Sequence, residues 1–436
     1  MKKMTRIIAL CFCFGLLLNS CTRDKCQVSQ TYTKFTPVYM SSTEFREAVK
    51  SDSPKSLKHP GKMYFKDNYI FVNEYLKGIH VIDNSNPAAP QIVSFISIPG
   101  DIDIAAKGNV LYADSYTDLV AINIGNPSSI TELSRITAVF DYPMYLNGTM
   151  LDASKGFPKD FIEEVVTETI VGDCGYNNQR AETGGTLFNS GPNTQNGSGG
   201  VSNTTGGGGS TPNPSSGTGG SMARFATYQD FLYVVTKSSL KIFSTADPAT
   251  PTYNNDLNVG WGIETIFPYN QALFLGSTSG MFIYDVTNPS NPVQLSEFSH
   301  ITSCDPVVVQ GNTAYVTLRN GNSCFGYSNQ LDIIDVTTLT APVQIASHDM
   351  FNPHGLGVDA EKVFICDGTE GLKIFDASNP NQLTSLAKYS GISTFDVIPL
   401  VNQKVLLMIG DNGLFQYDYS NTTDIRLIST IPVVKE

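Results

Sequence analysis

The most constraining feature of this chain is a short apolar run that recurs seven times and ends, in five copies, in Asp. Measured at the last residue of the run, successive copies lie 40, 121, 41, 50, 41 and 42 residues apart. The base period is therefore 40 to 42 residues, with one unit about nine residues longer and another about 80 longer. A fixed period of this length is typical of repeat architectures, in which each unit packs against its neighbours. The seven runs are 78–83, 119–123, 240–244, 281–285, 331–335, 372–376 and 414–418.

Each run predicts one strand of a four-stranded unit. Its apolar residues are continuous or nearly so, as expected for a strand buried on both faces. An aromatic-rich strand precedes it, as at 69–72, and before that comes another strand that ends near a Gly-Asn or Asp-Asn turn, as at 108–109. A fourth strand follows the run, as at 91–95.

Four strands per repeat of about 41 residues make one propeller blade. Seven such blades close into a ring that leaves no long exposed edge. We therefore predict an all-β fold, a seven-bladed β-propeller of four-stranded antiparallel blades over 60–436, with one long low-complexity insertion.

The residue that ends each run predicts a turn. An Asp side chain at this position can accept a hydrogen bond from the backbone two residues on, and the Asn-Pro that often follows ends the strand. Asn123 and Ser244 replace the Asp in two copies, and Leu339 and Thr422 replace the Pro in two others. A second Pro, such as Pro90, often opens the fourth strand, where an outer edge needs no backbone donor.

These motifs resemble a known repeat. Ile-Ile-Asp-Val at 333–336 and Ile-Phe-Asp-Ala-Ser-Asn-Pro at 374–380 look like the LVIVD repeat, which is found in β-propeller proteins of bacterial surfaces. The stretch 74–126 is similar to lipoproteins of Bacteroidetes. The resemblance covers roughly 60–140 and 223–433, and it implies a propeller fold and an envelope compartment. It implies no particular activity, because one fold hosts many functions.

The first 20 residues predict a secretory signal peptide. Three basic residues precede an apolar run over 7–18, which is too short to cross a bilayer. Leu-Leu-Asn-Ser-Cys at 17–21 resembles the lipobox of bacterial lipoproteins, with Asn19 where that family has a smaller residue. The resemblance implies cleavage before Cys21 and acylation of Cys21, so that 21–59 is a lipidated segment and linker. An ordinary signal peptide with a chance Cys is the alternative.

The same resemblance implies an outer-membrane address, because Thr22 follows Cys21 where an Asp would suggest retention at the inner membrane. The periplasmic face and the cell surface both stay open. Several acyl chains, at about 0.8 kcal/mol per buried methylene, give a stable anchor. Loss of 1–20 removes three positive charges and changes the net charge from −12 to −15. We therefore expect membrane contact through the lipid alone, no nucleic-acid partner and no oligomer.

Residues 139–222 interrupt the repeat. Within them, 157–171 is compatible with a short amphipathic helix or with a strand, because its apolar residues fit both periods. From 189 to 221 the chain is mainly Gly, Ser, Asn, Thr and Pro without charge, which predicts a disordered linker. The insertion is either a lid or partner-docking segment or a tolerated surface insertion.

Two of the eight Cys leave with the signal peptide, and Cys21 is the acylation site. Cys304 begins the first strand of the fifth unit, and Cys324 lies in the enlarged loop of that unit on the same face. A disulfide between them would suit an oxidising envelope, but sequence does not fix connectivity. Cys366, in an apolar strand, is expected to be a buried free thiol. The absence of Cys-x-x-Cys disfavours redox exchange and structural zinc.

Alignment of the blades brings one set of side chains to the start of the first strands. In a closed ring these starts converge on one mouth of the central channel, where the carboxylates would form an acidic rim with a focused negative potential. Trp261, the only Trp, would stack on a sugar or aromatic ligand. The alternative is a set of solvated loop residues, turn formers and partners of channel water. The candidate ligand-binding residues are Asp101, Asp103, Arg224, Trp261, Glu264, Asp305, His354 and Asp396.

The sequence has no His-Glu-x-x-His, Gly-x-Ser-x-Gly, phosphate-binding loop or calcium loop. We therefore predict no catalytic residue and no cofactor other than a divalent cation at the acidic mouth. The favoured function is a non-catalytic module that binds a protein or a glycan. The alternatives are a propeller enzyme that acts on a carbohydrate or lactone at this mouth, and a purely structural surface protein.

Overall fold

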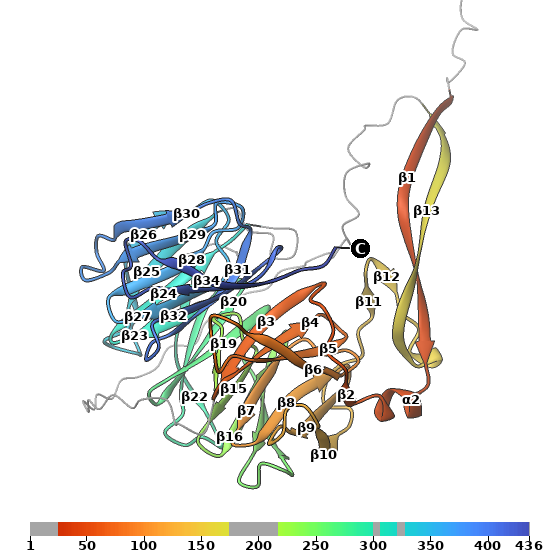
Figure 1. Cartoon of the computed structure of the whole chain (residues 1–436), viewed down its shortest axis with the longest axis horizontal. Helices are drawn as coiled ribbons and strands as arrows, with labels where there is room; N and C mark the ends of the chain where they lie inside the picture. The colour runs from red at the N-terminus through yellow and green to blue at the C-terminus, as the bar shows by residue number, and fades with distance from the viewer. Residues whose placement is uncertain (1–24, 174–216, 300–305, 321–327, 436) are drawn as a thin grey trace, which may run out of the picture. The chain divides into compact units, whose positions relative to one another are not determined.

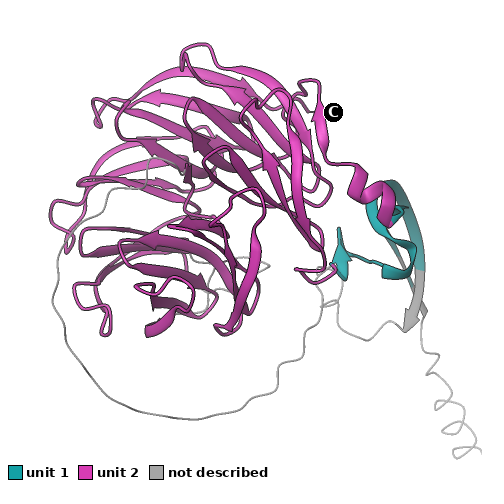
Figure 2. Ribbon diagram, turned by 90° about the horizontal axis from the view of Figure 1, so that it is seen from below, with its two compact units in different colours: residues 1–41, 143–198 teal, residues 42–142, 199–436 magenta. Residues whose placement is uncertain are grey.

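The computed structural model describes residues 25–173, 217–299, 306–320 and 328–435. The chain forms two compact units, coloured separately in Figure 2. Unit 1 consists of 1–41 and 143–198, and unit 2 consists of 42–142 and 199–436. Within the described residues, no helix has both the length and the apolar character needed to cross a membrane.

Unit 2 contains seven blades of four consecutive antiparallel strands, which confirms the predicted seven-bladed propeller (Figure 1). In blade 1 two short strands, described below, extend the sheet at its edges. Blades 1 to 4 consist of β3 (Pro60–Lys66), β4 (Tyr69–Glu74), β5 (Gly78–Asp83) and β6 (Gln91–Ser97); β7 (Ile104–Lys107), β8 (Val110–Ser115), β9 (Asp118–Asn123) and β10 (Thr131–Ile136); β15 (Phe225–Tyr228), β16 (Phe231–Val235), β17 (Ser239–Ser244) and β18 (Thr252–Asn258); and β19 (Ile263–Tyr269), β20 (Ala272–Ser277), β21 (Gly280–Asp285) and β22 (Val293–Ser299). Blades 5 to 7 consist of β23 (Val307–Gln310), β24 (Thr313–Leu318), β25 (Gln330–Asp335) and β26 (Val343–Asp349); β27 (Leu356–Asp359), β28 (Lys362–Cys366), β29 (Leu372–Asp376) and β30 (Thr384–Tyr389); and β31 (Thr394–Leu400), β32 (Val405–Gly410), β33 (Gly413–Asp418) and β34 (Arg426–Pro432).

The first strand of each blade lines the axis of the ring. These strands contact one another in the cyclic order β3, β7, β15, β19, β23, β27, β31 and back to β3. The hydrophobic core is correspondingly divided into clusters that lie between neighbouring blades, such as the cluster shared by blades 7 and 1. Burial between sheets explains the nearly continuous apolar runs of the third strands.

The turn predicted after each third strand is present in all seven blades. The side chain at the end of the run accepts a hydrogen bond from the backbone N–H two residues on, at 2.7 to 3.5 Å. Asn123 and Ser244 make the same bond as the five Asp residues, with Gly125 and Ala246 as donors. The two copies that depart from the sequence pattern therefore keep the local structure.

The outer strand of every blade carries a β-bulge opposite the third strand. In four blades a Ser follows the bulged residue, and its hydroxyl donates to a backbone carbonyl in the turn of the next blade at 2.6 to 2.7 Å. A bulge changes the direction of the next side chain, so this irregularity ties each of these blades to its neighbour. The four residues are Ser94, Ser134, Ser296 and Ser429.

The ring closes without exchange of strands between the two ends of the propeller. Blade 7 draws its four strands from 394–432, and Val433, just after β34, forms a parallel bridge with Leu57, just before blade 1. The amides of Asn84 and Gln416 exchange two buried hydrogen bonds of 3.0 and 2.6 Å across this junction. Ser429 adds a bond to the carbonyl of Pro87 at 2.7 Å.

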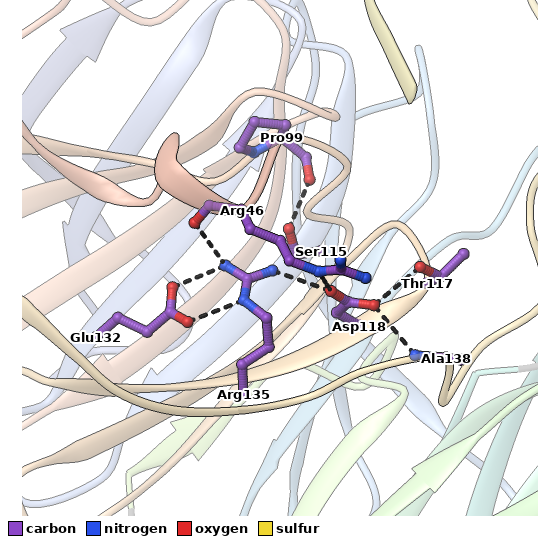
Figure 3. Close-up of polar contacts among 8 residues, drawn as sticks. All are labelled: Arg46, Pro99, Ser115, Thr117, Asp118, Glu132, Arg135 and Ala138. Atoms are coloured by element: carbon purple, nitrogen blue, oxygen red, sulfur yellow. Dashed lines mark hydrogen bonds and ion pairs between the residues drawn. The ribbon is translucent and has the colours of Figure 1, made fainter. Parts of the chain in front are cut away.

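A strap precedes blade 1, where the sequence predicts only a linker. It contains α2 (Ser42–Glu47) and β2 (Lys50–Asp52), which pairs with the outer edge of β6. Figure 3 shows how an ion-pair cluster holds α2 on blade 2. Asp118 is fully buried and accepts from Arg46 at 3.1 Å and from Arg135 at 3.3 Å. Arg135 also forms a forked pair with Glu132.

Unit 1 is built around a long two-stranded ribbon, β1 (Lys25–Met40) paired antiparallel with β13 (Phe157–Asp173) (Figure 1). The second strand decides the open choice for 157–171 in favour of a strand. The hairpin of β11 (Tyr145–Leu146) and β12 (Thr149–Met150) and the short 3₁₀ helix η2 (Ala153–Lys155) complete the unit. Thr149 Oγ1 donates to the carbonyl of Phe35 at 2.8 Å and connects the hairpin to the ribbon.

Candidate functional site

The candidate residues gather on one face of the propeller, which we name the mouth face. It is the face at which the first strand of each blade begins and the second strand ends, because adjacent strands run antiparallel. Loops between blades and loops between second and third strands therefore share this face. Six of the predicted residues lie there at the axis, namely Asp101, Asp103, Arg224, Glu264, His354 and Asp396.

Asp103 is paired and buried. Its carboxylate accepts from Lys62 Nζ at 2.7 Å and from the backbone N–H of Arg224. Asp114, at the end of β8, accepts the backbone N–H groups of Ile102 and Asp103 at 2.9 Å and so fixes the loop before β7. Burial raises the pKa of Asp114 and lowers the pKa of Lys62. The pair is therefore a buried junction between blades 1, 2 and 3.

Asp101 is also fully buried, and Asn73 donates to its carboxylate and, at 3.2 Å, to its backbone carbonyl. Its second carboxylate oxygen has no hydrogen-bond partner in the described structure. Burial and the nearby Asp114 carboxylate raise the pKa of Asp101 well above its ordinary value. This environment favours a protonated, uncharged Asp101.

The end of the low-complexity insertion enters the centre of the ring. We name 217–224 the axial segment. It begins with β14 (Thr218–Gly219), which pairs with the inner edge of β3. Ala223 accepts a backbone hydrogen bond from Ile266 in blade 4 at 2.8 Å. The residues 217–221 are thus ordered, although they belong to the stretch predicted to be disordered. Residues 189–216 of that prediction lie outside the described residues.

Asp396 meets the axial segment from blade 7. Its Oδ1 accepts from Ser221 Oγ at 3.3 Å and from the backbone of Val397 at 3.0 Å, while Oδ2 has no partner within the described residues. Ser221 Oγ in turn accepts from the backbone N–H of Leu356 in blade 6 at 2.8 Å. Burial raises the pKa of Asp396 to about 7. The axial segment therefore connects blades on opposite sides of the channel.

A cavity of about 110 Å³ remains beside the axial segment. It has charged and apolar walls, and it combines residues from blades 1, 4, 5 and 6. Its lining residues are Lys62, Met222, Glu264, Thr265, Pro306, Arg319 and His354.

The ionisable groups of the cavity differ in charge. Burial, reinforced by the Arg319 guanidinium, lowers the pKa of His354 to about 4, so its imidazole is neutral at pH 7. Burial raises the pKa of Glu264, and the positive charges of Arg319 and Lys62 act in the opposite direction. Among the described residues, Arg319 and the imidazole of His354 make no hydrogen bond or ion pair with protein groups.

The structure differs from the expected open acidic rim. Asp101, Asp103 and Asp396 are 0%, 3% and 2% exposed. Asn73 holds Asp101, whereas Asp103 and Asp396 contact the axial segment through Arg224 and Ser221. The cluster is a mixed one, in which Lys62, Arg224 and Arg319 accompany the carboxylates. Asp305 lies outside the described residues, as do Cys21, Cys304 and Cys324. Cys366 is a fully buried free thiol, as predicted.

Trp261 is apart from the buried cluster and is 73% exposed in the loop between β18 and β19. Two other exposed aromatic residues occupy mouth-face loops, Tyr75 between β4 and β5 and Phe351 between β26 and β27. Within the described part of the chain, no three His, Cys, Asp or Glu side chains are grouped so that they could hold a metal ion.

Sequence reasoning missed Lys62, Asp114 and Arg319. Lys62 lies at the start of the first strand of blade 1, and the same alignment extended to that blade would have found it. Asp114 and Arg319 lie where second strands end, and antiparallel geometry brings these ends to the mouth face as well. A search that included both kinds of strand ends would have included all three.

Comparison with known proteins agrees with this repeat structure. The family model of the LVIVD repeat matches residues 63–96, 101–138 and 362–390, which fall in blades 1, 2 and 6. No curated protein matches the chain by sequence.

Solved structures share the fold. A protein from Lactobacillus plantarum is similar at 11% identity over 86% of this chain and 97% of its own, with a TM-score of 0.52. The periplasmic gluconolactonase PpgL of Pseudomonas aeruginosa is similar at 11% identity over 85% of this chain and 96% of its own, also with a TM-score of 0.52. The computationally designed protein Ika8 is similar at 9% identity over 88% and 92%, with a TM-score of 0.50. At these identities the similarity concerns the fold alone.

Proposed function

We propose that this chain, a seven-bladed β-propeller that carries LVIVD repeats, is a cell-envelope lipoprotein that binds a glycan at its mouth face without catalysis. The observation that supports the proposal is the set of three exposed aromatic side chains on mouth-face loops. Trp261, Phe351 and Tyr75 are 73%, 55% and 48% exposed. Aromatic rings that stay exposed on a polar face are typical of binding surfaces, because each offers a large apolar area at low cost in conformational entropy.

A glycan fits this face better than a protein. The three rings come from separate loops around a cavity with charged and apolar walls, so they do not form one continuous apolar patch of the kind that protein interfaces bury. The cavity between them offers a carboxyl group, an imidazole and cationic donors that can bond to hydroxyls. A protein ligand is an alternative outcome of the test.

The test compares aromatic residues on and off the mouth face. The purified protein is screened on a glycan array, and affinity for the best ligand is then measured for Trp261→Ala, Phe351→Ala and the control Tyr253→Ala. Tyr253 is 53% exposed but lies on the outer strand β18. Loss of one stacking contact, at about 1.4 kcal/mol, weakens binding about tenfold. Equal losses in the control and in the mouth-face variants would exclude this face.

A second candidate is an enzyme that acts on a carbohydrate or lactone. The neutral His354 and the Glu264 carboxyl line the same cavity, and such a pair can exchange protons with a substrate. The similarity to a periplasmic gluconolactonase is consistent with this chemistry but reflects the fold alone. Conversion of the array ligand, or of sugar lactones, by the wild type and its loss in His354→Ala would favour the enzyme.

The lipid anchor is proposed from the lipobox resemblance. Cys21→Ala is expected to move the protein from the membrane fraction to the soluble fraction and to abolish labelling by a fatty-acid analogue. Membrane association that persists in this variant would refute acylation at Cys21. Protease treatment of intact cells then distinguishes the cell surface from the periplasmic face.

A further inference from the structure

Arg319 follows β24 and lines the cavity of the mouth face. The other two cations of the cluster are engaged, Lys62 with the carboxylate of Asp103 at 2.7 Å and the guanidinium of Arg224 with the carbonyl of Val235 at 3.1 Å. Among the described residues, Arg319 has neither a hydrogen bond nor an ion pair with protein.

A half-buried guanidinium with no hydrogen-bonded acceptor is costly, because burial removes water and the nearby Glu264 carboxyl acts on it only through its charge. Five N–H donors in a planar fork match the two oxygens of a carboxylate. The neutral imidazole of His354, in the same cavity, can donate one further hydrogen bond. The cavity is therefore prepared for an anionic group, and its volume of about 110 Å³ has room for a carboxylate and the atoms next to it.

Glu264 limits the type of anion. Its carboxyl lines the same cavity and interacts electrostatically with Arg319 and Lys62. A dianion such as a phosphate monoester would be repelled more strongly by this carboxyl than a monoanion. Glu264 can instead accept hydrogen bonds from hydroxyls beside the ligand carboxylate.

We propose that the cavity binds the carboxylate of an acidic sugar, with the carboxylate on Arg319 and His354 and neighbouring hydroxyls on Glu264. This inference rests on the proposed glycan-binding function and deepens it, since it names the chemical class of the ligand. The sugar ring lies toward the mouth-face loops, where the exposed aromatic side chains are. The acidic sugar is either a uronic acid unit of a polysaccharide or a free sugar acid.

The test uses D-glucuronate, D-glucose and a polyuronate chain as probes in calorimetric titrations of the full-length protein at pH 7. Glucuronate or the polyuronate should bind at least tenfold more tightly than glucose. Arg319→Gln should reduce the ratio of the two affinities at least tenfold. Arg319→Lys, which keeps the charge but not the planar fork, should reduce this ratio less. The control Arg426→Gln changes an exposed arginine that pairs with Asp418 on outer strand β34.

The outcomes separate this inference from the proposed function. Binding of the polyuronate without the monosaccharide assigns the polymer as source, and binding of both equally assigns the free acid. Equal affinity for glucose and glucuronate, or an unchanged preference in Arg319→Gln that melts like the wild type, overturns the carboxylate site. If the affinity for neutral glycans still falls in Trp261→Ala, the glycan-binding function stands. If no sugar of any charge binds, both proposals fail.

Discussion

The carboxyl of Asp396 gives the sharpest prediction about stability. Asp396 belongs to β31, is 2% exposed and contacts the axial segment through Ser221, and its Oδ2 has no hydrogen-bond partner in the described structure. Burial raises its pKa to about 7, against an ordinary carboxyl value of 3.8. Between about pH 4 and pH 7, the Asp396 carboxyl is therefore protonated in the folded protein but ionised in the unfolded chain. Stability should fall as the pH rises from about 4 to 7 and then level off.

The magnitude follows from the two pKa values. A difference of about three pH units between the folded and unfolded states corresponds to a loss on the order of 4 kcal/mol across this window. Asp396→Asn replaces the carboxyl with a neutral group of the same shape and cannot ionise. The free energy of unfolding of the variant, relative to the wild type, should therefore rise by several kcal/mol between pH 4.5 and pH 8.

The assay is urea unfolding followed by circular dichroism at pH 4.5, 6 and 8. The control is Asp376→Asn, because hydrogen bonds from Lys362 and Ser378 lower the pKa of that half-buried turn carboxyl. Its contribution is lost only as the pH falls below the unfolded pKa of 3.8, so this control should show no change between pH 4.5 and 8. A difference between wild type and Asp396→Asn that stays constant from pH 4.5 to 8 would refute the protonated carboxyl.

Three other substitutions test the packing of the ring, each by urea unfolding of purified protein. Ser429→Ala removes the bond from the last blade to the carbonyl of Pro87 and should lower the free energy of unfolding by about 1 kcal/mol, whereas no change would show that the seam does not need it. Asp118→Ala leaves two arginines without their shared carboxylate and should cost about 3–5 kcal/mol; a loss below 1 kcal/mol would contradict the cluster of Figure 3. Gly220→Ala places a methyl carbon 1.8 Å from Asp396 Oδ2, and it should cost about 1–3 kcal/mol unless the axial segment is free to move.

The propeller could be predicted from sequence because each blade repeats the same local instructions. The run 281–285, its terminal Asp and the following Asn-Pro specify a buried strand and a turn without reference to the rest of the chain. The same logic even covers Asn123 and Ser244, which keep the turn bond with other side chains. The ribbon of β1 and β13 could not be predicted, because its strands lie far apart in sequence and belong to no repeat.

The site was only partly predictable. Alignment brought Asp103 and Asp396 to the axis, but it gave no sign that they would be covered. The covering residues, such as Ser221, come from a stretch whose composition indicates disorder. They are ordered by contacts with several blades, and such contacts cannot be read from local composition. Arg319 was not among the predicted site residues, because the prediction considered only the starts of first strands and Arg319 follows a second strand.

The junction between blades 7 and 1 has a consequence for how such a chain can change in length. The four strands of each blade are consecutive in the chain, and no blade is completed by a strand from the opposite terminus. Duplication or deletion of the gene segment that encodes one repeat of about 41 residues therefore adds or removes a whole blade, and the connections within the other blades do not change. Leu57 and Val433 then need only form the same bridge in a ring with a different number of blades.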